Sequence, residues 1–222
     1  DVVAGENSTL VIVLPEDATG VVNVTVGKDS YKANVTDGVA SVKINSLIAG
    51  DYKVNVTYSG DKTYEVSNNV FNLAVNPMKV NLNISDIVMI YKDGTRMVAV
   101  LTDYKGNPIA NATVYFSING VTYVRTTDVN GSASIGLNLG SGVYGASVYY
   151  NGSDMYDKVS KNITVTINPT VLADDLVKMY KNATKFSAKF TDSTGKALVN
   201  SDVRFNINGV FYTRTTDANG VA

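Results

Sequence analysis

The sequence predicts an all-β protein built from tandem β-sandwich domains in an elongated array. Three observations predict this fold class. Short segments alternate strictly between apolar and polar residues, tight-turn residues separate these segments, and one long pattern occurs more than once. The composition agrees, because Val, Thr, Tyr, Asn and Gly are abundant, while Gln is absent and only three residues are Glu.

The alternating segments predict strands with one buried face. In Tyr52–Tyr58 (YKVNVTY) the tyrosines and valines fall on one face, and Lys, Asn and Thr on the other. The segments Val22–Val26, Val114–Ile118 and Ile163–Ile167 follow the same rule. Turn signals such as DATG, SINGV and YNGSD stand between them. About seven short strands per 90 residues are typical of two sheets packed face to face.

The chain matches itself at two offsets. At an offset of 89 residues, Asp86–Ala133 aligns without a gap with Asp175–Ala222, and about half of the positions are identical. At an offset of 92, Gly50–Tyr64 aligns with Gly142–Tyr156, and both matches continue to an Asn-Pro pair. The sequence therefore contains one kind of unit, seen about two and a half times.

The repeat predicts three domains: 1–77, in which the first strand is missing; 78–169, which is complete; and 170–222, which holds the N-terminal part of a third unit. We expect the chain to be a fragment of a longer one. The third unit would expose an apolar sheet face and open edges, so we expect it either to borrow strands from a neighbouring molecule or to be poorly ordered.

Two local features refine the fold prediction. Tyr52 and Tyr144 each open a strand shortly after a glycine, which is the position of the tyrosine corner in immunoglobulin-like domains. Pro77 and Pro169 fix the backbone where one unit meets the next and leave almost no linker. We therefore expect immunoglobulin-like sandwiches that abut in a stiff rod.

The motifs of the middle unit resemble a known family. Asp103–Phe116 (DYKGNPIANATVYF), followed by Thr126–Ala133 (TTDVNGSA), is similar to the immunoglobulin-like repeats of invasin and intimin type. The run from Gly142 to Tyr156 resembles related repeats of archaeal adhesin-like surface proteins. This resemblance implies an extracellular stalk at the cell surface that presents a distal binding region and takes part in cell adhesion.

Composition excludes several classes of function. The absence of His and Cys removes the most common general base, the Ser-His and Cys-His nucleophile pairs and His/Cys zinc sites. The net charge is −1 without a basic stripe, which argues against nucleic-acid binding. The longest apolar runs, such as Leu10–Leu14, are far shorter than the roughly 20 residues that cross a bilayer. We expect no enzyme, cofactor, metal or membrane insertion.

Glycosylation is the modification that the sequence favours most. Asn-x-Ser/Thr sequons fall on the polar faces of predicted strands or in turns, where a glycan has room. The same pattern also follows from outward Asn and Thr residues beside Val, without any glycan. The candidate sites are Asn7, Asn23, Asn34, Asn55, Asn83, Asn111, Asn130, Asn151, Asn162 and Asn182.

The other candidates have a simpler structural interpretation. Asp128–Ser132 and Asp217–Gly220 contain part of a calcium-loop pattern, but Asp and Asn before Gly are typical of tight turns. Arg125 and Asp128, like Arg214 and Asp217, could pair across such a turn. Tyr58 with Tyr64, and Tyr150 with Tyr156, could form a sugar-binding shelf, but core packing is favoured. The carboxylate pairs Asp174-Asp175 and Asp154/Asp157 lack a pocket signature, and a Lys–Asn isopeptide bond stays open.

The main hypothesis is a non-enzymatic segment of a cell-surface protein, a stiff stalk of immunoglobulin-like repeats. The alternatives are a carbohydrate- or cell-wall-binding module and accessory repeats of a surface hydrolase. The partner would be a host or cell-surface protein or glycan, and strand exchange through the third unit is a further expectation. The sequence identifies neither the ligand nor the anchor nor the oligomeric state.

Overall fold

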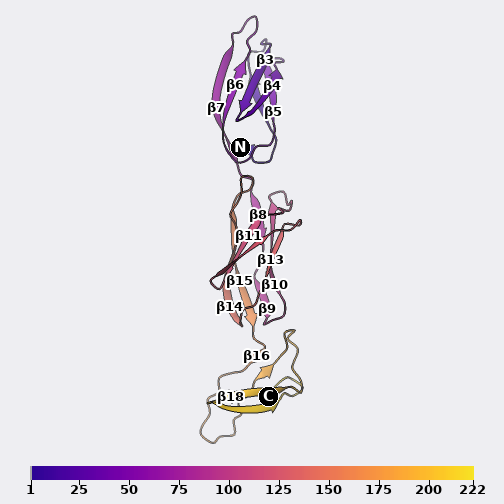
Figure 1. Ribbon diagram of the computed structural model, residues 1–222, viewed down its shortest axis with the longest axis vertical. Coiled ribbons are helices and arrows are strands. Elements are labelled where there is room, and N and C mark those ends of the chain that lie inside the picture. The colour runs from indigo at the N-terminus through magenta and orange to yellow at the C-terminus, as the bar shows by residue number, and fades with distance from the viewer. Residues whose placement is uncertain (1) are drawn as a thin grey trace. The chain divides into compact units, whose positions relative to one another are not determined.

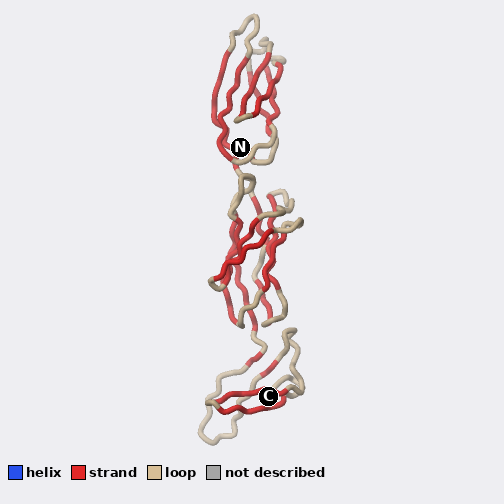
Figure 2. The backbone as a smooth tube through the Cα atoms, in the orientation of Figure 1, coloured by secondary structure: helices blue, strands red, loops and turns tan. Residues whose placement is uncertain are grey.

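The computed structural model describes residues 2–222, and these residues form strands and loops without a helix (Figures 1 and 2). The all-β prediction is therefore confirmed. Because helices are absent, the described residues contain no helix long and apolar enough to cross a membrane. The paired strands fall into three groups along the chain, within residues 2–76, 80–168 and 171–215.

The first group forms a five-stranded sheet, in the order β1-β7-β6-β3-β4, and a two-stranded sheet, β2-β5. Its strands are β1 (Val2–Val3), β2 (Ser8–Val13), β3 (Val21–Val26), β4 (Asp29–Asn34), β5 (Val39–Ile44), β6 (Gly50–Tyr58) and β7 (Ser67–Asn76). All pairings are antiparallel except that of β1 with β7, which is parallel.

The second group repeats this plan with one strand more. Its sheets have the orders β12-β11-β14-β15-β9 and β13-β10-β8. The strands are β8 (Val80–Asn83), β9 (Ile87–Ile90), β10 (Arg96–Asp103), β11 (Thr113–Ile118), β12 (Val121–Thr126), β13 (Ser132–Gly136), β14 (Gly142–Tyr150) and β15 (Val159–Asn168). Strand β9 pairs in parallel with β15, as β1 does with β7. Strand β8 has no counterpart among the described residues of the first group.

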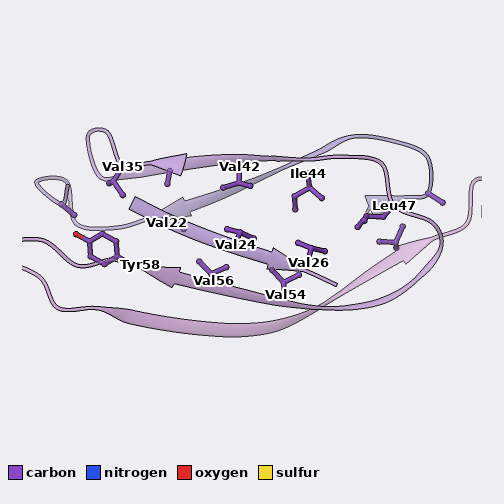
Figure 3. Packing of buried hydrophobic residues seen from close by; sticks show 14 residues of the cluster. Val22, Val24, Val26, Val35, Val42, Ile44, Leu47, Val54, Val56 and Tyr58 are labelled. Carbon is purple, nitrogen blue, oxygen red and sulfur yellow. The ribbon is translucent and has the colours of Figure 1, made fainter. Parts of the chain in front are cut away.

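The core of the first group lies between its two sheets (Figure 3). Alternate residues of β3, such as Val22 and Val24, and of β6, such as Val54, point toward Val42 and Ile44 of β5 (Figure 3). All five side chains are at most 3% exposed. Burying a valine or isoleucine side chain stabilises the fold by about 1.5–3 kcal/mol, so the period-two pattern read from the sequence is the main source of stability.

Tyrosine corners and tight turns fix the strand ends. The Tyr52 hydroxyl donates to the Ile48 carbonyl at 3.1 Å, and the Tyr144 hydroxyl donates to the Gly140 carbonyl at 3.0 Å. Each bond ties the start of a strand to the loop four residues before it, as in immunoglobulin-like domains. In the hairpin β11-β12, Asn119 (φ 49°) and Gly120 (φ 74°) both adopt positive φ, which a two-residue type I′ turn requires.

The apolar side chains of the third group are less buried than those of the other two groups. It contains β16 (Val171–Leu172), β17 (Lys189–Phe190), β18 (Asp202–Ile207) and β19 (Val210–Thr215), which form two separate two-stranded sheets. Phe205 packs edge-to-face against Phe186 and Phe190, at centroid distances of 5.6 and 6.0 Å. Many apolar side chains nevertheless stay exposed: Leu176, Val177, Met179, Phe186, Ile207 and Phe211.

Candidate functional site: a junction between consecutive repeats

The first compact unit of the structure extends beyond the first repeat. It combines the described residues up to Leu82 with Leu101–Ile109 and Tyr150–Val159, two segments that belong to the second repeat by sequence. The Asn76-Pro77 pair lies within this unit. Two loops of the second repeat therefore pack with the first repeat, and the residues that join them form the candidate site, called the junction below.

Met155 is the apolar centre of the junction. It lies in the loop between β14 and β15 and packs, partly buried, against the core cluster of the first repeat. Its Sδ lies 2.9 Å from where a Cβ at position 5 would be, and Met78 Cε lies 3.4 Å from that point. Gly5, which has φ +78°, therefore provides both the turn and the room for the two methionines.

Backbone hydrogen bonds hold the same loop. The Met78 amide donates to the Met155 carbonyl at 2.9 Å, and the Asp157 amide donates to the Met78 carbonyl at 2.9 Å. The Ala49 amide donates to the Asp154 carbonyl at 2.7 Å. Met78 directly follows Asn76-Pro77, so the backbone after the linker is hydrogen-bonded to protein and not to water.

Two ion pairs surround these contacts. Lys79 Nζ lies 2.6 Å from Asp157 Oδ2, and Lys105 Nζ lies 2.6 Å from Glu6 Oε1. The Tyr104 hydroxyl also donates a hydrogen bond to Glu6 Oε1. Hydrogen bonds from Lys105 and Tyr104 hold the pKa of Glu6 below its usual value, and those from Lys79 and the Lys158 amide do the same for Asp157.

A buried carboxylate shapes the turn that presents Tyr104 and Lys105. Asp103 is 6% exposed and accepts hydrogen bonds from the amides of Lys105 and Asn107. Burial raises the pKa of Asp103, but the hydrogen bonds from Asn107 and Lys105 outweigh this effect, so the pKa lies below its usual value. The Tyr104 amide donates to the Lys79 carbonyl at 3.0 Å, which joins this turn to the chain after Pro77.

The asparagines of the sequons do not lie together in one site. Nine of the ten asparagines are exposed, and they are distributed over all three repeats. Asn55 is the exception, because it is half-buried in the middle of β6 and its Oδ1 is buried without a hydrogen-bond partner. Two of the exposed asparagines have structural contacts: Asn7 Oδ1 accepts from the Ser46 amide, and Asn182 Oδ1 accepts from the Thr184 amide.

The calcium-loop candidates are turns held by their own aspartates. Asp128 Oδ1 accepts from the amides of Asn130 and Ser132, and Asp217 Oδ1 accepts from those of Asn219 and Val221. Residues 2–222 contain no group of three metal-ligating His, Cys, Asp or Glu side chains.

The remaining candidates have structural partners or are solvated. The guanidinium groups of Arg125 and Arg214 donate to the carbonyl of the preceding residue. Tyr58 and Tyr150 are 4% and 6% exposed, so they belong to the core. The hydroxyl of Tyr64 donates to Asp17. In the described chain no lysine is buried, and the Asp174-Asp175 pair is exposed.

Sequence reasoning missed the junction because its contacts are made between repeats. The sequence suggests Asp157 only as part of a carboxylate pair, whereas its carboxylate binds Lys79. One signal was present: at an offset of 92, Met155 takes the place of Thr63 in an otherwise similar loop. An apolar residue where the other copy has an exposed polar one indicates a contact that only one copy makes.

A long curated protein is among those similar to the chain. The inverse autotransporter adhesin YeeJ of Escherichia coli (strain K12) is 27% identical over 240 residues, which cover 97% of this chain and 10% of that protein. The chain thus spans about a tenth of the length of this relative. No protein-family model matches the sequence.

Solved structures of adhesins are distant matches. Invasin, described as a bacterial integrin-binding protein, is 16% identical with a TM-score of 0.42, covering 90% of this chain and 50% of that one. The adhesin InvE of Yersinia pseudotuberculosis is 12% identical with a TM-score of 0.33, covering 95% of this chain and 69% of that one.

Removing the side chain of Met155 should loosen the junction selectively. We expect Met155→Ala to cost about 1 kcal/mol of local stability, because a half-buried methionine is lost. Hydrogen exchange at the Ala49 and Met78 amides should then accelerate roughly fivefold. Thr63→Ala, at the matching exposed position of the first repeat, is the control. Equal protection of both amides in Met155→Ala and the wild type would show that Met155 does not hold the junction.

Acid should weaken the junction through Glu6 and Asp157. Both pKa values are lowered in the folded chain, so their stabilisation is present above the unfolded values of about 4 and is lost as pH falls through the folded ones. Exchange at the Met78 amide, corrected for its intrinsic rate, should therefore accelerate below about pH 4. In a Glu6→Gln/Asp157→Asn variant this acceleration should be smaller. An identical pH profile in both proteins would contradict the assignment.

Proposed function

We propose that this chain is a non-enzymatic segment of a cell-surface adhesin, in which immunoglobulin-like repeats form a stiff stalk that presents a distal binding region. The junction carries this proposal. Met155 contributes to the core of the preceding repeat, and both sides of the Asn76-Pro77 linker are hydrogen-bonded, which supports a stiff joint. The similarity to an autotransporter adhesin over nearly the whole chain supports an extracellular location.

The stalk proposal also accounts for the chemistry of the chain. The carboxylates of Asp103 and Asp128 hold turns, those of Glu6 and Asp157 hold the junction, and the ionisable groups of residues 2–222 do not assemble into a metal cluster. A segment that transmits force and sets distance needs stable cores and stiff joints, and no reactive group. The binding partner, a host or cell-surface protein or glycan, would then contact another part of the adhesin.

Carbohydrate binding is the second candidate, and one observation favours it. Tyr115 of β11 and Tyr149 of β14 stack with centroids 4.9 Å apart and an interplanar angle of 6°, and both rings are half-buried on the outer face of the sheet. Flat aromatic surfaces of this kind pack against sugar rings. Cross-strand stacking also stabilises a sheet without any ligand, so we rank this function below the stalk.

The stalk proposal predicts that the first two repeats tumble together. In ¹⁵N relaxation of the 222-residue chain, residues 2–76 and 80–168 should share one rotational correlation time. A variant with a Gly-Ser insertion between Asn76 and Pro77 serves as a reference with a flexible linker, and its two repeats should show two different correlation times. Wild-type values equal to those of this reference would overturn the proposal. Binding on a glycan array that is lost in Tyr115→Ala/Tyr149→Ala would favour the second candidate instead.

We further propose that the surface protein is a glycoprotein. This proposal rests on the ten sequons and on the exposure of nine of their asparagines. The proposal that the protein is archaeal rests on the sequence resemblance alone. Peptide mapping of protein from its native cells should find glycans on exposed sequons such as Asn111 and Asn151. Asn55 should stay unmodified, because its amide is half-buried within a sheet. An intact mass equal to that of the bare polypeptide would rule glycosylation out.

A further inference from the structure

We propose that strand β12 of the second repeat pairs with β12 of a second copy of this chain, edge to edge and in antiparallel direction. The pairing joins the five-stranded sheets of the two copies around a two-fold axis at Val124. Its role in adhesion rests on the function proposed above and adds a partner to it, because cells that carry this protein would bind each other through it. The pairing itself is argued from β12 alone.

Strand β12 is an open edge in the interior of the sequence. It lies at one end of the sheet order β12-β11-β14-β15-β9, and β13, the next strand along the chain, pairs with β10 instead. All of its residues are exposed. Val121 and Tyr123 are 48% and 36% exposed, although their cross-strand partners Ile118 and Phe116 are 4% and 0% exposed. The second sheet therefore covers β11 and leaves β12 open.

The hairpin turn determines which backbone groups face this edge. Ile118 and Val121 flank a two-residue turn, so they exchange hydrogen bonds with each other, and every second residue of β12 then bonds to β11. The Thr127 amide, which donates to the Ala112 carbonyl at 2.9 Å, follows the same alternation. The residues whose amides and carbonyls point toward the open edge are therefore Thr122, Val124 and Thr126.

The sequence of β12 is complementary to itself in antiparallel register. When Val124 lies opposite Val124 of the second copy, Thr122 lies opposite Thr126, and each opposed pair can exchange two backbone hydrogen bonds. On the other face, Tyr123 of each copy lies opposite Arg125 of the other. A guanidinium over a tyrosine ring is a favourable cation–π contact, and no two like charges are directly opposed.

Arg125 is available for this contact. Within the described chain it forms no ion pair, and its guanidinium donates to the Val124 carbonyl at 2.7 Å. A carbonyl oxygen has two lone pairs, so the Val124 carbonyl can still accept from an added strand. The same chain already places an arginine on an aromatic ring of a neighbouring strand, because Arg204 of β18 lies over Phe211 of β19 at 4.4 Å.

The matching strand of the third repeat keeps the residues that this pairing uses. At an offset of 89, β19 has the same residue types as Val121, Tyr123 and Arg125, whereas Thr213 takes the place of Val124. Arg214 also donates to the preceding carbonyl, at 2.7 Å. Because the second sheet leaves this face of β12 open, core packing does not explain why Tyr and Arg recur there.

The matching strand of the first repeat shows the opposite design. Strand β4 has Lys32 in the place of Val124 and Ala33 in the place of Arg125. Pairing β4 with itself would place Lys32 opposite Lys32 of the second copy and would offer no arginine to the tyrosine. Like charges in direct opposition destabilise a strand pair, and an edge lysine is a common protection against association. Strand β12 lacks this protection at its central position.

The geometry of the pair determines its strength and its direction. One strand edge buries less than the roughly 1,000 Å² of a stable interface, so a single contact should be weak and several repeats would have to act together. A two-fold axis perpendicular to the sheet reverses every strand in it. Each repeat therefore runs opposite to the repeat that it contacts, as expected for stalks that come from two facing cells.

Association of the 222-residue chain tests the pairing. In sedimentation velocity we expect a reversible monomer–dimer equilibrium between about 10 µM and 1 mM. Over this range, hydrogen exchange at the Thr122, Val124 and Thr126 amides should slow at least threefold, whereas the Tyr123 and Arg125 amides, already bonded to β11, should change little. The amides of β4 should not respond.

Variants copied from the other repeats provide the matched controls. Val124→Lys introduces the residue of β4 and should abolish the dimer, whereas Val124→Thr introduces the residue of β19 and should keep it. Arg125→Gln should weaken association roughly tenfold, because two cation–π contacts are lost in the symmetric pair. Adding Tyr123→Leu to Arg125→Gln should weaken it little further, since both changes remove the same contacts.

Single cysteines test the direction of the pair, because the chain has none of its own. In the antiparallel register, a Thr122→Cys chain mixed with a Thr126→Cys chain should form the mixed disulfide faster than either chain forms a disulfide with itself. Val98→Cys, at a valine of β10 with a similar exposure of 45%, should not cross-link.

Three results would overturn the proposal: a monomer at every concentration, equal association of Val124→Lys and the wild type, or a preference of Thr122→Cys for itself. The second result would assign the association to another surface, and the third would indicate a parallel pair. None of them decides the stalk proposal, which depends on the correlation times within one chain. A monomer whose first two repeats share one correlation time would exclude the pairing and retain the stalk.

Discussion

The strands that build the cores, such as β3 and β11, alternate between a buried apolar face and a more exposed one, and the apolar face is stable only when a second sheet covers it. The matched positions of the second and third repeats show the constraint directly. Phe116 and Ile118 are 0% and 4% exposed between the two sheets of the second repeat. Their counterparts Phe205 and Ile207, at an offset of 89, lie on an isolated hairpin, where Ile207 is 51% exposed. The exposure of a residue at a matched position thus differs with whether a second sheet lies against its face.

The junction obeys the same constraint at the end of a sandwich. Two packed sheets leave their core open where the strands stop, and something must close it. In the first repeat this closure includes Met155, a residue of the next repeat by sequence. The residue that closes this core thus comes from the next repeat by sequence, and the ion pairs of Lys79 and Lys105 surround it.

The sequence predicted whatever depends on local chemistry. Alternation identified the strands, the tyrosine corners at Tyr52 and Tyr144 form as expected, and Asn-Gly turns lie where hairpins need positive φ. It could not predict the junction, because its side chains meet across about 100 residues (Glu6 with Lys105) and each is ordinary in its own strand or turn. Nor could it show that Asn55, on the polar side of its strand, is half-buried with an unpartnered carbonyl oxygen.

The repeats also differ where function can change without changing the fold. Tyr115 and Arg204 occupy matching outward positions; the first stacks on Tyr149, and the second lies over the ring of Phe211, 4.4 Å from its centroid. Substituting an outward residue leaves the buried face intact, because successive side chains of a strand point to opposite faces. A chain of such repeats therefore keeps its cores constant and varies its surfaces, edges and junctions. Any specific property of this protein has to be located in those three places.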